Sequence, residues 1–90
     1  MESARARVSI RNRLGLHARP AMAFIDAANA FESNVHIHKG AQVVDGKSIM
    51  QVMMLAATQG TELEIRAEGA DAQAAIKALS ELVNRGFDED

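Results

Sequence analysis

Apolar residues along the chain follow two alternating periods, one typical of strands and one of helices. Where every second residue is apolar, the pattern predicts a strand with one buried and one solvated face. Where apolar residues recur three and four positions apart, it predicts an amphipathic helix. The predicted strands are residues 5–11, 34–39, 41–44 and 62–68. The predicted helices are residues 18–29, 48–57 and a last one that begins near Asp71 and stops near Gly86.

The predicted order is therefore βαββαβα. Strands with one wet face are typical of an antiparallel sheet that is covered on one side only. Three amphipathic helices would supply that cover, which predicts an α+β two-layer open-faced sandwich. Outward arginines of the first strand would face the outward Glu62, Glu64 and Glu68 if the first and fourth strands are neighbours. The 90 residues are expected to form one domain, residues 1–90.

Composition narrows the function classes. The net charge is −2, so nothing indicates a nucleic-acid partner. No cysteine is present, which excludes disulfides and thiolate metal sites and fits a reducing cytosol. No apolar run approaches the roughly 20 residues that span a bilayer, so no membrane insertion is expected. These features predict a cytoplasmic protein.

A histidine stands at the predicted start of the first helix. Pro20 fits only the first turn of a helix, which places His17 at or beside the N-cap. Unpaired N–H groups and the positive end of the helix dipole favour an anion there. Arg19 adds a planar cation that suits a phosphate.

Two interpretations of this stretch remain open from the residues alone. A neutral imidazole has a free ring lone pair, so His17 could attack a phosphoryl donor and become a transient phosphohistidine. Alternatively, His17 is only an N-capping residue beside a surface arginine. The spacing His-x-Arg is too short a motif to decide between them.

The motif Gly15-Leu16-His17-Ala18-Arg19-Pro20-Ala21 resembles the active-site signature of the histidine-containing phosphocarrier proteins, HPr and its nitrogen-system relative NPr. The resemblance runs from about Val8 to Phe87. It implies a sheet of strand order 1-4-2-3 and a phosphoryl carrier, which needs no cofactor and is not an enzyme. It also implies that His17 is phosphorylated by Enzyme I, that Arg19 stabilises the phosphate, and that IIA-type domains accept it. A monomer is expected.

A second motif, Gly46-Lys47-Ser48-Ile49-Met50, resembles the regulatory serine segment of the same family. With Gln51, Ser48 also matches the capping box S-x-x-Q, in which the two side chains satisfy each other's backbone amides. A cap alone would explain this serine. The resemblance adds phosphorylation of Ser48 by an HPr kinase/phosphorylase, which would bring about two negative charges to the partner-binding face without unfolding the helix.

The second predicted helix carries more apolar residues than one buried stripe needs. Some must be exposed, and flexible methionines suit a surface that several partners use in turn. The expected partner-binding residues are Ala18, Ala21, Lys47, Ile49, Met50 and Met53. The alternative is that Met50 and Met53 are scattered surface residues.

Two strand histidines and the acidic ending of the chain remain to be interpreted. His36 and His38 would point the same way from a strand, but two ligands without a third make a poor metal site, so no metal is expected. The acidic ending Asp88-Glu89-Asp90 is expected to be frayed.

Ser48 resembles the sugar-uptake HPr branch, whereas the ending from Asn84 to Asp90 resembles NPr. An NPr-type regulatory phosphocarrier or interaction module is therefore the alternative to a carrier for sugar transport.

Overall fold

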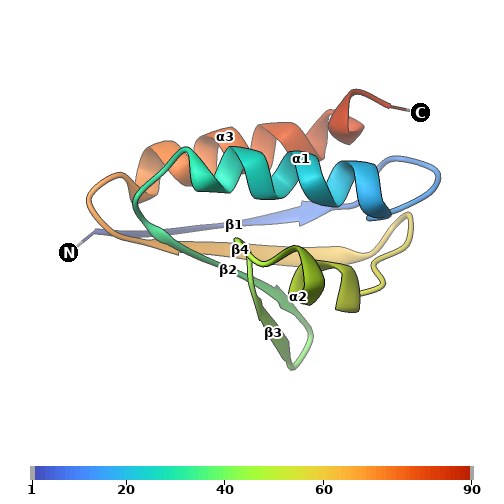
Figure 1. Cartoon of the computed structure of the whole chain (residues 1–90), viewed down its shortest axis with the longest axis horizontal. Helices are drawn as coiled ribbons and strands as arrows, with labels where there is room; N and C mark the ends of the chain where they lie inside the picture. The colour runs from blue at the N-terminus through green and yellow to red at the C-terminus, as the bar shows by residue number, and fades with distance from the viewer. Residues whose placement is uncertain (1, 90) are drawn as a thin grey trace.

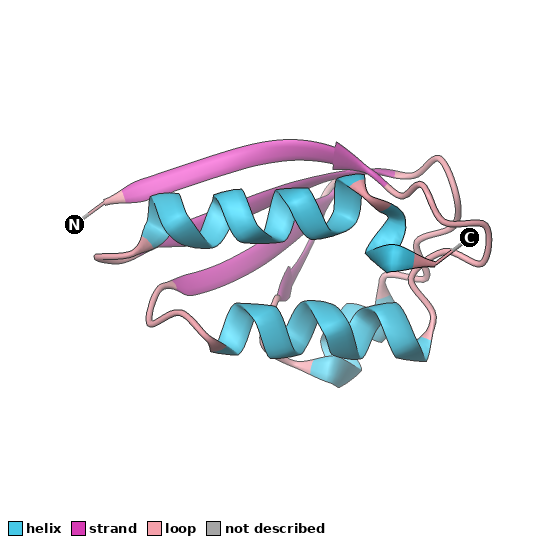
Figure 2. Ribbon diagram, turned by 90° about the horizontal axis from the view of Figure 1, so that it is seen from above, coloured by secondary structure: helices cyan, strands magenta, loops and turns pink. Residues whose placement is uncertain are grey.

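Four strands form one sheet, and α1 and α3 lie side by side over one of its faces (Figures 1 and 2). The computed structural model describes residues 2–89. The strands are β1 (Ser3–Ser9), β2 (Asn34–Lys39), β3 (Gln42–Asp45) and β4 (Glu62–Glu68). The helices are α1 (Ala18–Asn29), α2 (Ile49–Met54), α3 (Ala72–Asn84) and a final 3-10 turn, η1 (Gly86–Asp88). The predicted α+β open-faced sandwich is confirmed.

The order of strands in the sheet is β1-β4-β2-β3, as the family resemblance implied. All three neighbouring pairs are antiparallel. In the central pair, Ile37 of β2 faces Ile65 of β4, and both point to the core. β1 and β4, the two longest strands, pair along their whole length.

The core lies between the sheet and the helices. The alternating strand residues point inward, and the helices contribute the predicted stripes. The sheet supplies Val8, Val35, Ile37, Leu63, Ile65 and Ala67. The helices supply Ala21, Phe24, Ile25 and Ala28 from α1 and Ala75, Ile76, Leu79, Leu82 and Val83 from α3. Each of these two helices therefore buries one apolar stripe, as its helical spacing predicted.

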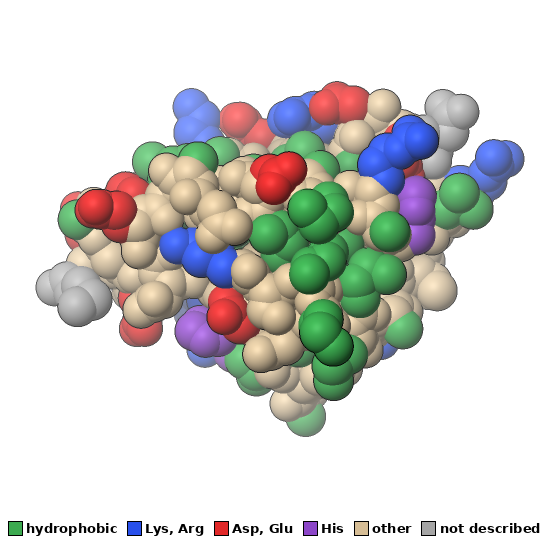
Figure 3. Space-filling view, viewed as in Figure 1, with side chains coloured by type: hydrophobic (Ala, Val, Ile, Leu, Met, Phe, Trp, Pro, Cys, Tyr) green, Lys and Arg blue, Asp and Glu red, His purple; other side chains and the backbone are tan. Residues whose placement is uncertain are grey.

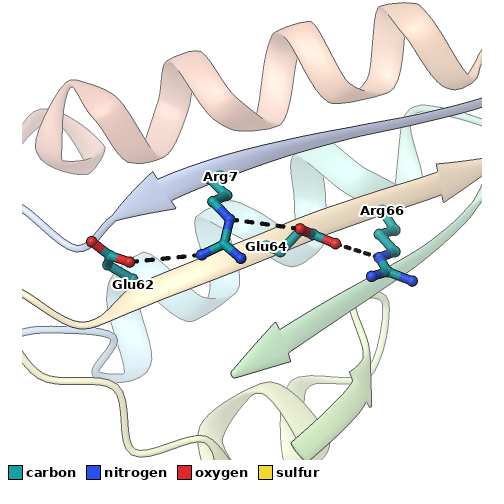
Figure 4. A network of polar contacts seen from close by, with 4 residues as sticks. All are labelled: Arg7, Glu62, Glu64 and Arg66. Atoms are coloured by element: carbon teal, nitrogen blue, oxygen red, sulfur yellow. Dashed lines mark hydrogen bonds and ion pairs between the residues drawn. The ribbon is translucent and has the colours of Figure 1, made fainter. Parts of the chain in front are cut away.

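The uncovered face of the sheet carries charged side chains. Arg7 approaches Glu62 at 3.7 Å and Glu64 at 3.9 Å, and Arg66 also bonds Glu64 (Figure 4). The hydrogen bond from Arg66 is the main reason why the pKa of Glu64 is below its ordinary value, and the nearby arginine charges add to it. Arg5, however, lies opposite Arg66 in the register, and Glu68 lies opposite Ser3. The expected row of opposite charges is thus right for Arg7 and wrong for Arg5.

Three element boundaries differ from the predictions. β1 begins and ends two residues earlier than predicted, although Ile10 stays buried and still exchanges backbone hydrogen bonds with Thr61 and Gly60. β3 is shifted by one residue. α2 ends at Met54 rather than near Ala57, since Ala56 adopts a left-handed backbone with φ of 49° that a helix cannot contain.

Candidate functional site

His17 is the N-cap residue of α1. Its backbone is extended, with φ −79° and ψ −172°, and its carbonyl accepts the first helical hydrogen bond from the amide of Ala21 at 3.0 Å. Its ring makes no capping bond to the helix, so the ring is free for other partners. The amides of Ala18 and Arg19 belong to the first turn and have no intrahelical acceptor. The predicted position of His17 at the N-cap is confirmed, and the unpaired amides of the first turn lie at the same end of α1 as His17.

The loop that carries His17 is held against the end of α2. The amide of Leu16 donates to the carbonyl of Ala57 at 2.8 Å. Gly15 has φ of 72°, and a Cβ at this position would lie 2.5 Å from the same carbonyl oxygen. Any larger residue would therefore need both a strained backbone and a displaced loop. The approach of the two segments brings the residues after α2 next to the start of α1.

Asn12 ties this loop together from inside. Its side chain is buried, and its Nδ2 donates to the carbonyl of Gly15 at 2.6 Å and to Oε1 of Glu89 at 2.9 Å. Both partners are acceptors, which determines which end of the amide faces them. The carbonyl Oδ1 of Asn12 is then a buried acceptor without a partner among the described residues. Asn12 was not among the predicted site residues.

Glu89 also contacts the His17 ring. Its Oε1 lies 2.8 Å from Nε2 of His17, and its side chain is only 16% exposed. The hydrogen bond with His17, followed by that from Asn12 and the charge of Arg19, holds the pKa of Glu89 below its ordinary value. An ionised carboxylate can only accept, so Nε2 carries the hydrogen. In the neutral ring Nδ1 then keeps its lone pair and is available to an electrophile.

The prediction of a frayed acidic tail is therefore wrong for Asp88 and Glu89; Asp90 lies outside the described residues. After α3 the chain reverses through Gly86, with φ of 69°, and η1 buries Phe87. Arg85 pairs with Asp88 at 3.0 Å across this turn. An apolar residue directly after the glycine that ends a helix was the sequence signal for a tail that packs back. No local pattern could point to Glu89 itself, since its partner is 72 positions away.

Arg19 lies exposed on the first turn of α1. Its charge is the smallest of the contributions that lower the pKa of Glu89. His17 and Arg19 both lie at the start of α1, and Glu89 and Asn12 join His17 through hydrogen bonds.

Ser48 is the N-cap residue of α2, and its Oγ accepts from the amide of Gln51 at 3.3 Å. The reciprocal half of the predicted capping box is wrong. Oε1 of Gln51 accepts from the amide of Asp45 at 2.9 Å, while the amide of Ser48 donates to the carbonyl of Asp45. The turn before α2 thus satisfies the Ser48 amide and leaves the glutamine free to reach β3. Lys47 extends back to the carbonyl of Phe31 at 2.7 Å.

Exposed hydrophobic side chains gather over α1 and α2 on the face shown in Figure 3. We call the following set the apolar patch: Met22, Met50, Met53 and Met54. Met50 is 74% exposed, which confirms that α2 has more apolar residues than it buries. Leu14, in the loop before His17, is exposed as well and, like Met22, was not predicted.

The other residues expected at partner contacts differ in exposure. Ala18 is exposed, and Lys47 and Ile49 are half-buried. Ala21 is fully buried on the inner side of α1, so the expectation that it contacts partners is wrong. It belongs to the helical stripe that packs on the sheet.

The uncovered sheet face carries a separate hollow of about 800 Å³, lined by residues that include Arg5, His36, His38 and Arg66. His17 does not line it. Among residues 2–89, no group of three potential metal-ligating side chains comes together. No described helix is long and apolar enough to cross a membrane.

Comparison with known proteins agrees with this geometry. Residues 4–85 match a family model described as PTS HPr component phosphorylation site. Phosphocarrier protein HPr of Neisseria meningitidis serogroup A is 46% identical over 82 residues, which cover 91% of this chain and 92% of the relative. Phosphocarrier protein NPr of Proteus mirabilis is 44% identical and covers 93% and 94%. The crystal structure of HPr-C-His from Thermoanaerobacter tengcongensis aligns with a TM-score of 0.93 and 40% identity over 97% of this chain and 98% of the other.

Fold and sequence together define a carrier protein that relays a group and does not turn over a substrate. The chain belongs to the HPr family of the bacterial phosphotransferase system. It is a phosphocarrier of the HPr/NPr type and not a catalyst.

Proposed function

We propose that His17 accepts a phosphoryl group at Nδ1 from phosphorylated Enzyme I and passes it to an IIA-type domain. The observation that carries this proposal is the ring at the N-cap of α1, whose Nε2 lies 2.8 Å from Oε1 of Glu89. With the hydrogen on Nε2, the neutral ring has its lone pair on Nδ1. The family match to a phosphorylation-site model adds support.

The transfer is a displacement at phosphorus. The Nδ1 lone pair of His17 forms the new N–P bond while the bond from phosphorus to the donor breaks, and the donor keeps that electron pair. The ring retains its hydrogen on Nε2 and becomes positively charged. The phosphoryl oxygens meet the unpaired amides of Ala18 and Arg19 and the Arg19 guanidinium, which favour negative charge.

The apolar patch is the proposed docking surface for both the donor and the acceptor, together with Ala18, Ile49 and Lys47. Methionine side chains repack easily, so one patch can fit two partners in turn. Ser48 lies at the start of α2, beside Ile49 and Met50. Phosphorylation of Ser48 by an HPr kinase/phosphorylase would place charge at the edge of this surface. The carrier is proposed to act as a cytoplasmic monomer of one domain.

An NPr-type role in the nitrogen-related branch is the second candidate. The ending from Asn84 to Asp90 supports it, while the identities of 44% to an NPr and 46% to an HPr do not separate the two branches. In that case, the phosphorylation state of His17 would control binding to regulatory partners rather than sugar uptake.

A phosphotransfer assay tests both parts. The purified protein is incubated with labelled phosphoenolpyruvate and Enzyme I from either the sugar or the nitrogen branch. We expect acid-labile label on the parent protein and on a His36→Ala control, and none on His17→Ala. The Enzyme I that labels faster identifies the branch. Undiminished labelling of a folded His17→Ala protein would contradict the assignment of His17.

A further inference from the structure

The C-terminal segment supplies a carboxylate to the His17 ring. We propose that Glu89 is a positioning residue for phosphoryl transfer, which orients the ring through Nε2 and keeps the proton on that nitrogen while Nδ1 carries the phosphoryl group. This inference rests on the function proposed above for His17.

The carboxylate is itself held in place. Oε1 of Glu89 accepts from both Nε2 of His17, at 2.8 Å, and Nδ2 of Asn12, at 2.9 Å. Asn12 is buried and is bonded to the carbonyl of Gly15. The side chain of Glu89 is only 16% exposed, whereas that of His17 is 37% exposed, so water reaches the contact mainly from the side of the ring. The ring is therefore restrained on the side away from Nδ1 by groups that belong to the folded loop.

The charge of Glu89 matters most after the phosphoryl group has arrived. The N–P bond uses the Nδ1 lone pair, so a ring that keeps its Nε2 hydrogen carries a positive charge. A carboxylate at hydrogen-bond distance stabilises that positive form. When the phosphoryl group moves on, the N–P electron pair returns to Nδ1 and a neutral imidazole leaves. Had Nε2 lost its proton first, the leaving group would be an imidazolate anion, which is much poorer.

Glu89 lies outside the part of the chain that defines the family match, which ends at residue 85. The segment that brings it back is nevertheless well anchored. Phe87 is buried, and the pair Arg85–Asp88 closes the turn. The contact is thus a built feature of this chain's ending and does not follow from the family's phosphorylation-site motif.

Two variants and one matched control test the proposal. Glu89→Gln preserves the shape but removes the charge, Glu89→Ala removes both, and Glu81→Gln removes one charge from the exposed surface of α3. Each protein is phosphorylated with Enzyme I and phosphoenolpyruvate. Onward transfer to an IIA-type domain is then measured across pH 6–9, and the Nε2 proton of the phosphorylated ring is followed by ¹⁵N NMR.

We expect both Glu89 variants to lose the Nε2 proton of phosphohistidine at lower pH than the parent. Their onward transfer should fall by about fivefold above that pH and approach the parent's rate below it. Glu81→Gln should behave like the parent. A Glu89→Gln protein with the parent's pH profile, or with a rate lowered equally at every pH, would overturn the positioning role. If the parent carries no label on His17 at all, the proposed function fails instead.

Discussion

At the scale of single residues, the proposed transfer divides the two ring nitrogens of His17 between two tasks. Nε2 contacts Glu89, and Nδ1 would carry the phosphoryl group. Glycine at position 15 is required by the same geometry, because its positive φ and its contact with the carbonyl of Ala57 bring the loop close to α2. Arg19 is the one guanidinium on the first turn of α1.

Replacing Arg19 with Ala should separate acceptance from stabilisation of the phosphoryl group. The amides at the start of α1 remain, so Arg19→Ala should still be phosphorylated on His17. Loss of the charge-assisted hydrogen bonds should slow transfer roughly tenfold. Rapid-quench measurement with Enzyme I gives the rate, and Arg13→Ala, which alters an exposed arginine before the helix, is the control. Equal rates for the parent and Arg19→Ala would show that the guanidinium has no such role.

At the scale of elements, α1 and α2 meet so that a phosphorylation motif and an apolar patch share one face. Ser48 is the N-cap of α2, and the exposed Met50 lies in the first turn of this helix. A charge at position 48 would therefore lie beside Met50. The same charge interacts favourably with the helix N-terminus, by roughly 0.3–1 kcal/mol. Docking and stability should therefore respond to it in opposite ways.

Ser48→Asp tests this separation. The variant should melt no lower than the parent, because the aspartate can cap the helix. It should receive phosphate from Enzyme I more slowly, mainly through a raised KM, since the charge must lose water when an apolar partner surface docks. Thermal melts and steady-state transfer check the two effects, and Ser80→Asp on α3 is the control. Parent-like transfer by the enzymatically Ser48-phosphorylated protein would leave Ser48 as a cap only.

At the scale of the whole molecule, alternation and helical spacing were sufficient to predict the layers, since each strand has one buried face and each helix one buried stripe. The strand order needed the family resemblance, because alternation does not say which strands are neighbours. His17 was predictable because Pro20 marks the helix start locally. Glu89 was not, because its bonds to Asn12 and His17 join distant parts of the chain. Asn12 was not predicted either, although its bond to Gly15 is local. The buried position of Ala21 followed from its place in the α1 stripe, although the motif suggested otherwise.

One long-range contact should make global stability depend on pH. The Asp71 carboxylate, at the start of α3, accepts from the amides of Glu32 at 2.8 Å and Ser33 at 2.9 Å, and from the Ser33 hydroxyl. The bond with the Ser33 hydroxyl, followed by those with the two amides, lowers the pKa of Asp71. The folded protein therefore binds this proton less readily than the unfolded chain, and the contribution is present above the ordinary value of 3.8.

That contribution should be lost as the pH falls through the lowered pKa of Asp71. Urea unfolding between about pH 6 and pH 2 should show a smaller acid loss of unfolding free energy for Asp71→Asn than for the parent. Asp26→Asn, which alters an exposed carboxylate on α1, should keep the parent's acid loss. An Asp71→Asn protein whose free energy falls as steeply as the parent's would contradict this account.

The central claim, that Nδ1 of His17 carries the phosphoryl group, can be read from one spectrum. The protein is labelled with ¹⁵N in its histidine rings and phosphorylated with Enzyme I and phosphoenolpyruvate. Coupling between phosphorus and each ring nitrogen is then recorded. We expect phosphorus to couple directly to Nδ1 of His17, with the hydrogen still on Nε2. Direct coupling to Nε2, or to a ring nitrogen of His36 or His38, would contradict the account.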